Sequence, residues 1–123
     1  MKVIVPIERD EGLKSVVASH FGRAPYFAVV ELKDDGSFDS MKVIENVGEH
    51  LGGRVSVEEF IGKLKPDALL VKGMGPRGLD AFQRQGVAVF TGTLDTVEGA
   101  VQSYVKGQLR GLTEPCREAR HRF

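Results

Sequence analysis

The chain has 123 residues, of which 41% are hydrophobic and 28% are charged. This length and balance are typical of one globular domain with its own core, and they exclude a largely disordered chain. The 17 basic and 17 acidic residues cancel, so no overall positive field is present to attract nucleic acid. The apolar runs have the length of strands, and the first residues do not resemble a signal peptide. We therefore expect no membrane span and a cytoplasmic location.

The single cysteine, Cys116, limits the metal and redox chemistry that the chain can perform. One thiol cannot form an internal disulfide, and it cannot by itself build a thiolate cage for a metal. Any bound metal cluster would need histidines, backbone atoms or a second chain as further ligands.

The first half of the chain predicts a buried strand followed by a β-hairpin. Residues 1–7 are rich in Val and Ile without alternation, which is typical of a strand buried on both faces in the middle of a sheet. Residues 8–24 have no clean period and predict a long loop. Residues 26–33 and 41–45 are β-prone runs, and the turn sequence Asp34-Asp35-Gly36 lies between them.

The second half predicts helices that alternate with strands. Strands are expected over residues 68–72 and 87–91, because both are short apolar runs bounded by turn residues. Capping and terminating residues predict three helices. The predicted starts are Ser56 with Glu59, Pro76, and Asp95 with Glu98, and the predicted ends are Leu64, Gly86 and Gly107.

This order of elements predicts an α/β fold. Alternating strands and helices pair in parallel through right-handed crossovers, whereas the hairpin adds antiparallel pairing. We therefore expect a mixed, mainly parallel sheet of about five strands, with helices on both faces. Residues 1–112 are predicted to form the domain, and residues 113–123 to form a charged, flexible tail, because periodicity is lost from residue 110 onward.

Three runs give the chain a resemblance to a known family. They are Ser19-His20-Phe21-Gly22-Arg23-Ala24-Pro25-Tyr26-Phe27, Gly73-Met74-Gly75-Pro76-Arg77 and Gly86-Val87. In these runs and their spacing, the chain resembles the dinitrogenase iron-molybdenum cofactor accessory domains, over nearly its whole length to about residue 112. The resemblance implies a three-layer α/β/α fold with a ribonuclease H-like motif. It also implies binding or carrying of an iron-sulfur or iron-molybdenum cofactor or its precursor, with cofactor assembly proteins as partners.

The first run contains three candidate ligand-binding residues. His20 could offer an imidazole to iron, and Gly22 would permit close approach of the backbone. The alternative is that Phe21 anchors the loop in the core while a buried His20 bonds a backbone carbonyl. Arg23 could receive an anionic cluster or an oxyanion, or it could be an ordinary solvated arginine. Phe21, Tyr26 and Phe27 are predicted to be core anchors.

Two further loops contribute candidates. Gly73, Gly75 and Arg77 lie where a strand turns into a helix, and the first amide groups of such a helix attract anions. The alternative is a purely structural turn, since no complete phosphate-binding motif is present. His50 lies among glycines and could be a second imidazole ligand or an exposed loop histidine. We expect these loops to share the carboxyl edge of the sheet with His20, which is the usual ligand crevice of such sheets.

The last candidates are Cys116 and His121, which lie five residues apart in the charged tail. Together with His20 and His50 they are the candidate metal ligands, or else the tail is inert. The family often has further cysteines or histidines in this region, so the pattern indicates transient carriage rather than permanent ligation.

No catalytic trio or carboxylate pair can be placed in the sequence, and we therefore expect a carrier and not an enzyme. The alternatives are a protein-interaction or regulatory domain without a cofactor, and an enzyme acting on a small phosphorylated ligand. The chain is expected to be a monomer or a weak homodimer.

Overall fold

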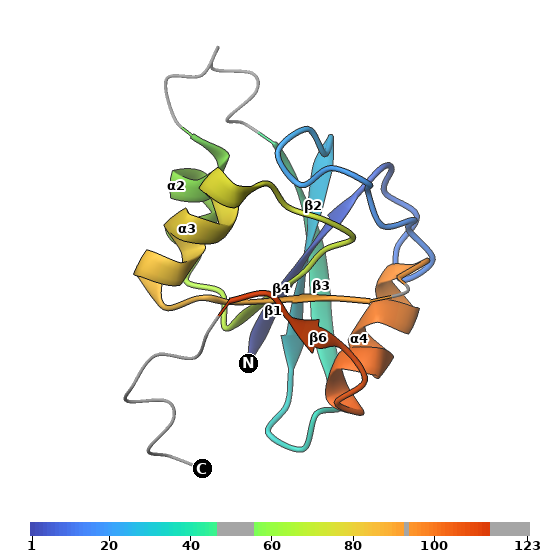
Figure 1. The fold of residues 1–123 in the computed structure, drawn as a ribbon. Helices are drawn as coiled ribbons and strands as arrows, with labels where there is room; N and C mark the ends of the chain where they lie inside the picture. The colour runs from blue at the N-terminus through green and yellow to red at the C-terminus, as the bar shows by residue number, and fades with distance from the viewer. Residues whose placement is uncertain (47–55, 93, 114–123) are drawn as a thin grey trace.

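The strands of the computed structural model form one mixed sheet between two layers of helices (Figure 1). The structure describes residues 1–46, 56–92 and 94–113. The elements are β1 (Lys2–Ile7), β2 (Tyr26–Leu32), β3 (Phe38–Glu45), α2 (Val57–Gly62), β4 (Ala68–Leu70), α3 (Pro76–Gln85), β5 (Ala88–Thr91), α4 (Val97–Val105) and β6 (Arg110–Gly111). Helices α2 and α3 cover one face of the sheet and α4 covers the other. The predicted three-layer α/β/α fold is confirmed.

The strand order is β3-β2-β1-β4-β5-β6. Strand β1 pairs antiparallel with β2 and parallel with β4, so it joins the hairpin to the parallel half of the sheet. Strands β1, β3, β4 and β5 run in one direction. We call the edge where these four strands end the carboxyl edge, and the opposite edge the amino edge.

The strand count differs from the expectation, because the described residues form six strands instead of about five. The additional strand, β6, has two residues and pairs antiparallel with Phe90 and Thr91. Its two exposed residues pair through backbone atoms, so no apolar pattern marks it in the sequence. Four of the six strands share one direction, but only two of the five neighbouring pairs are parallel.

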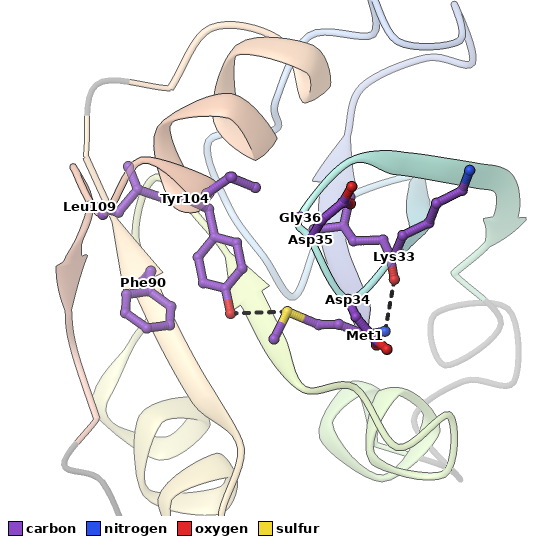
Figure 2. A pocket seen from close by; sticks show the side chains of 11 residues that line it. Met1, Lys33, Asp34, Asp35, Gly36, Phe90, Tyr104 and Leu109 are labelled. Carbon is purple, nitrogen blue, oxygen red and sulfur yellow. Dashed lines mark hydrogen bonds between the residues drawn. The ribbon is translucent and has the colours of Figure 1, made fainter. Parts of the chain in front are cut away.

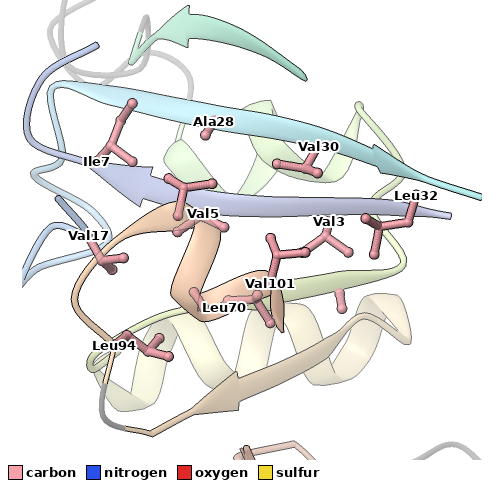
Figure 3. Packing of buried hydrophobic residues seen from close by; sticks show 13 residues of the cluster. Val3, Val5, Ile7, Val17, Ala28, Val30, Leu32, Leu70, Leu94 and Val101 are labelled. Atoms are coloured by element: carbon pink, nitrogen blue, oxygen red, sulfur yellow. The ribbon is translucent and has the colours of Figure 1, made fainter. Parts of the chain in front are cut away.

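Strand β1 is buried from Val3 to Ile7, as predicted for a strand between two helical layers. Val3, Val5 and Ile7 pack on the α4 side of the sheet (Figure 3). Ile4 points to the opposite side, where it joins the cluster beneath α2 and α3. Because side chains alternate along a strand, this single strand contributes to both cores.

The helix ends follow local rules with one correction. The Ser56 hydroxyl accepts the Glu59 N–H at 3.1 Å, and Gly86 ends α3 with φ of 74°, both as predicted. The predicted Asp95 cap is wrong, because α4 is capped by Thr96, whose hydroxyl accepts the Gly99 N–H at 3.2 Å. The Asp95 carbonyl instead accepts the Val17 N–H at 2.9 Å, which ties the loop after β1 to the start of α4.

Thr113 lies at the predicted boundary between domain and tail. Its hydroxyl accepts the Val89 N–H at 3.0 Å and donates to the Val87 carbonyl at 3.3 Å. This residue is therefore held against β5, whereas the rest of the predicted tail lies outside the described residues. No helix within the described ranges is long and apolar enough to span a membrane.

Two phenylalanines offer a matched test of this architecture. Phe82 of α3 has no exposed surface and Phe38 of β3 is 46% exposed. Replacing Phe82 with alanine should lower the free energy of unfolding by roughly 3–5 kcal/mol, because a large cavity remains in the core. Phe38→Ala should cost about 1 kcal/mol or less, because half of its side chain is already in water. Urea unfolding measures both, and equal losses would contradict the described burial.

Candidate ligand-binding site

Two loops meet beyond the carboxyl edge and enclose a hollow of about 670 Å³. The first loop joins β1 to β2, and the second joins β4 to α3. The hollow is within the size range of small-molecule and cofactor sites. Six predicted site residues line it: His20, Gly22, Arg23, Gly73, Gly75 and Arg77. The structure therefore brings these two loops together at the carboxyl edge of the sheet, as expected from the sequence.

The first loop is held in place by Phe21, which is buried as predicted. Its ring lies 5.2 Å from the ring of Phe27 and 5.6 Å, edge-on, from that of Phe82. His20 and Arg23 on either side are exposed. The alternative in which His20 is buried is therefore wrong, and its imidazole is accessible from the hollow.

Asn46 holds the same loop from the end of β3, and sequence analysis missed it. Its side chain is 1% exposed, and its Nδ2 donates to the carbonyls of Gly22 at 3.2 Å and Ala24 at 2.9 Å. Its backbone N–H donates to the Pro25 carbonyl at 3.1 Å. These bonds fix the backbone on both sides of Arg23. The partners lie more than twenty positions away, so no local pattern could reveal this role.

The second loop leads into the first turn of α3. Gly75 is the N-cap residue and, as a glycine, has no side chain that could cap the helix. Pro76 follows in the first turn. The amide groups of Arg77 and Gly78 come next, where a helix leaves its N–H groups without helical partners. Such groups attract an anion, and the helix dipole adds to the attraction.

Met74 and Glu58 also line the hollow, although neither was predicted. Gly78 is buried beneath them, and a Cβ there would lie 2.9 Å from Cγ and 3.0 Å from Sδ of Met74. The same Cβ would lie 3.7 Å from Oε1 of Glu58. The absent side chain at Gly78 thus leaves room for the Met74 thioether at the start of α3. No sequence spacing links α2 to this turn. Only the packing of α2 against α3 shows that Glu58 lies at the hollow.

The charged groups of the hollow favour an anionic ligand. Arg23 and Arg77 are permanently positive and can donate in a planar fork, and Glu58 is the one carboxylate among the described residues of the lining. His20 adds a nitrogen donor and Met74 a soft sulfur donor. This donor set suits a soft, negatively charged group that is held mainly by hydrogen bonds and charge.

The other predicted metal ligands, His50, Cys116 and His121, lie outside the described residues, and their roles stay predictions. In the described part of the chain, no three His, Cys, Asp or Glu side chains gather closely enough to hold a metal ion. His20 is the one candidate metal ligand whose position is described.

Comparison with known proteins places this site in context. A family model described as "Dinitrogenase iron-molybdenum cofactor" matches residues 1–107. The uncharacterized protein MJ0580 of Methanocaldococcus jannaschii is 26% identical over 112 residues, which is 89% of each chain.

Solved structures show the same fold. The crystal structure of PH0822 is 29% identical, with a TM-score of 0.76 over 90% of this chain and 96% of the other. The apo form of the orange protein from Desulfovibrio gigas is 24% identical, with a TM-score of 0.73 over 94% of this chain and 96% of the other.

Asn46 allows a direct test of how the first loop is held. In Asn46→Ala the carbonyls of Gly22 and Ala24 lose their donors. The free energy of unfolding should fall by roughly 1–3 kcal/mol, as expected when buried acceptors are left unpaired. Asn46→Asp should lower the free energy of unfolding at least as much, because a carboxylate oxygen, which accepts hydrogen bonds, would then face the two carbonyls in place of Nδ2. Asp39→Ala, at an exposed position of β3, is the control and should change stability by less than about 0.5 kcal/mol. Urea denaturation measures the free energy of unfolding of the three variants. Equal losses in all three would contradict the role given to the Asn46 hydrogen bonds.

Proposed function

Because the chain belongs to the dinitrogenase iron-molybdenum cofactor family, we propose that it binds and carries an anionic metal-sulfur cofactor or a precursor of one. The cargo would be of the iron-sulfur or iron-molybdenum type. The observation that supports this most directly is the convergence of Arg23, Arg77 and the first turn of α3 on one hollow. The protein would act in the cytoplasm and exchange cargo with cofactor assembly proteins.

The residues of the hollow would divide the work of binding. The guanidinium groups of Arg23 and Arg77 would donate hydrogen bonds to the anionic surface of the cargo, and the amides of α3 would add to them. His20 and Met74 would supply a nitrogen and a sulfur donor to exposed metal atoms. Few direct ligands and an open position suit a carrier, because cargo that is held by charge and hydrogen bonds can be handed over.

The proposal includes no catalytic step. Ser19, His20 and Glu58 line the same hollow, but no hydrogen bond joins any two of them in the described structure. A nucleophile is activated when a base lies within hydrogen-bond reach and a third group orients that base. These three residues are better explained as polar lining around a bound cargo.

Anaerobic reconstitution tests the carrier role. The protein is incubated with iron, sulfide and molybdate, desalted, and analysed by absorbance and by metal counting. Wild type should retain metal, and Arg23→Ala and Arg77→Ala should each weaken retention roughly tenfold, the value of one charge-assisted hydrogen bond. Arg84→Ala is the control, since Arg84 lies outside the hollow and pairs with Asp80 at 2.9 Å. No retention by wild type, or equal losses in all three variants, would contradict the proposal.

Two further variants resolve the parts played by the other polar groups. Glu58→Gln should increase retention, because it removes a negative charge from the lining while keeping the shape of the side chain. His20→Ala should reduce retention if its imidazole reaches metal. A loss of metal from Glu58→Gln would show that the carboxylate binds cargo and that the lining does not select an anion by charge.

A pair of glycines tests the shape of the hollow. In Gly78→Ala the new methyl group would meet Met74, which would move into the hollow and reduce metal retention severalfold. Stability should change by about 1 kcal/mol or less, because a flexible thioether can move. Gly75→Ala is the matched control, since a Cβ at Gly75 meets no atom within 4 Å. Equal retention by the two variants would contradict the described packing of Met74.

A further inference from the structure

A second hollow of about 530 Å³ lies on the α4 face of the sheet, toward the amino edge (Figure 2). It opens between the turn of the β2–β3 hairpin and the end of α4, and its lining includes Met1, Phe90 and Tyr104. Among the residues that the structure describes, it shares no lining residue with the site above. It therefore calls for an explanation of its own.

The hairpin turn and α4 meet at one point, which shapes the hollow. Gly36 has a φ of 87°, and a Cβ there would lie 3.0 Å from Cγ1 of Val105. A side chain at this position would be strained and would push α4 away. Gly36 thus lets the turn close against α4, and the two elements form opposite walls.

One wall is aromatic. The rings of Phe90 and Tyr104 pack edge-to-face with centroids 5.2 Å apart and an interplanar angle of 62°. Both residues are half-buried, and Leu109 lies beside them (Figure 2). Exposed ring surface of this kind favours a flat aromatic ligand, because the interaction free energy of two aromatic rings exceeds what their buried area alone provides.

The hydroxyl of Tyr104, which belongs to this wall, has only a weak hydrogen-bond acceptor. The Tyr104 hydroxyl donates to the Met1 thioether at 3.4 Å (Figure 2). A thioether sulfur is a poor acceptor, and the Met1 side chain is flexible and 53% exposed. A tyrosine hydroxyl keeps its proton at neutral pH, and burial, followed by the charge of Asp67, raises the pKa of Tyr104 further above its ordinary value. An oxygen or nitrogen acceptor on a ligand would form a stronger hydrogen bond with the Tyr104 hydroxyl than the Met1 sulfur does.

The charged residues at the rim do not select an ion. Lys33 extends its ammonium group away from Tyr104 (Figure 2). The Oδ1 atom of Asp35 accepts the N–H and the hydroxyl of Ser37 at 2.9 and 2.6 Å. The carboxylates of Asp34 and Asp35 are balanced by the ammonium groups of Lys33 and of the N-terminus, which donates to the Leu32 carbonyl at 2.9 Å, so neither an anion nor a cation is favoured.

We propose that this hollow is a second binding site, which takes a small, uncharged, planar aromatic molecule whose hydrogen-bond acceptor receives the Tyr104 hydroxyl. The ring would lie against Phe90 and Tyr104, and Met1 would move aside. The volume is within the range of small-molecule sites. This site is independent of the proposed carrier function.

Two matched probes test the site by nuclear magnetic resonance of the full chain. Benzamide and cyclohexanecarboxamide are both uncharged and share one acceptor group, but only benzamide has a planar aromatic ring. Benzamide should cause saturable shifts of backbone amides within residues 33–37 and 104–109, and cyclohexanecarboxamide should bind severalfold more weakly. Shifts that do not saturate, that occur at residues 19–23 and 73–78 instead, or that are equal for the two probes would overturn the proposal.

Variants identify the groups that bind the probe. Tyr104→Phe should weaken benzamide binding about fivefold, the effect of one neutral hydrogen bond. Phe90→Leu removes the second aromatic ring and should also weaken benzamide binding. This variant provides the test if Tyr104→Phe fails to fold. Arg77→Ala is the control at the first hollow and should leave benzamide binding unchanged. Unchanged binding in the folded aromatic variants, or a loss in Arg77→Ala, would overturn the assignment.

Discussion

The burial of β1 on both faces is the constraint on which the rest of the structure depends. The strand supplies side chains to both cores and pairs with a strand on each side, antiparallel with β2 and parallel with β4. Its antiparallel neighbour begins where β1 ends, and its parallel neighbour ends there too. The loop after β1 and the loop after β4 are therefore brought to one edge, where they form the first hollow.

The first hollow combines a rigid support with an accessible surface. Phe21 and Asn46 are buried and hold the loop, whereas His20 and Arg23, on either side of Phe21, are exposed. A binding group that is positioned before the ligand arrives loses less conformational entropy on binding. The hydrogen bonds of Asn46, which is not among the described lining residues, hold the loop, and the ring of Phe21 supports it from the core, so the binding groups are few and the site stays open.

The two hollows differ in chemistry because they lie at opposite edges of the same strands. At the carboxyl edge, α3 presents its N-terminal amides and two arginines lie nearby. Toward the amino edge, α4 ends and a hairpin turns, so the lining there combines aromatic and aliphatic side chains with the charged residues Lys33, Asp34 and Asp35 at the rim. The direction of the parallel strands thus separates the site proposed for an anionic cargo from the site proposed for an aromatic ligand.

Features with a local physical cause could be predicted from the sequence: the Ser56 cap, the turn at Gly36, the end of α3 at Gly86 and the double burial of β1. Each depends on residues a few positions apart, or on a pattern along one strand. Strand β6, the Asn46 bonds and the meeting of Glu58 with Met74 could not be predicted, because their partners are distant in sequence. The sequence by itself determined most of the helices and strands and which residues carry charge. The sequence also led us to expect two of the loops at one edge of the sheet, but only the tertiary structure decided which side chains share a hollow, because that depends on how strands pair and helices pack.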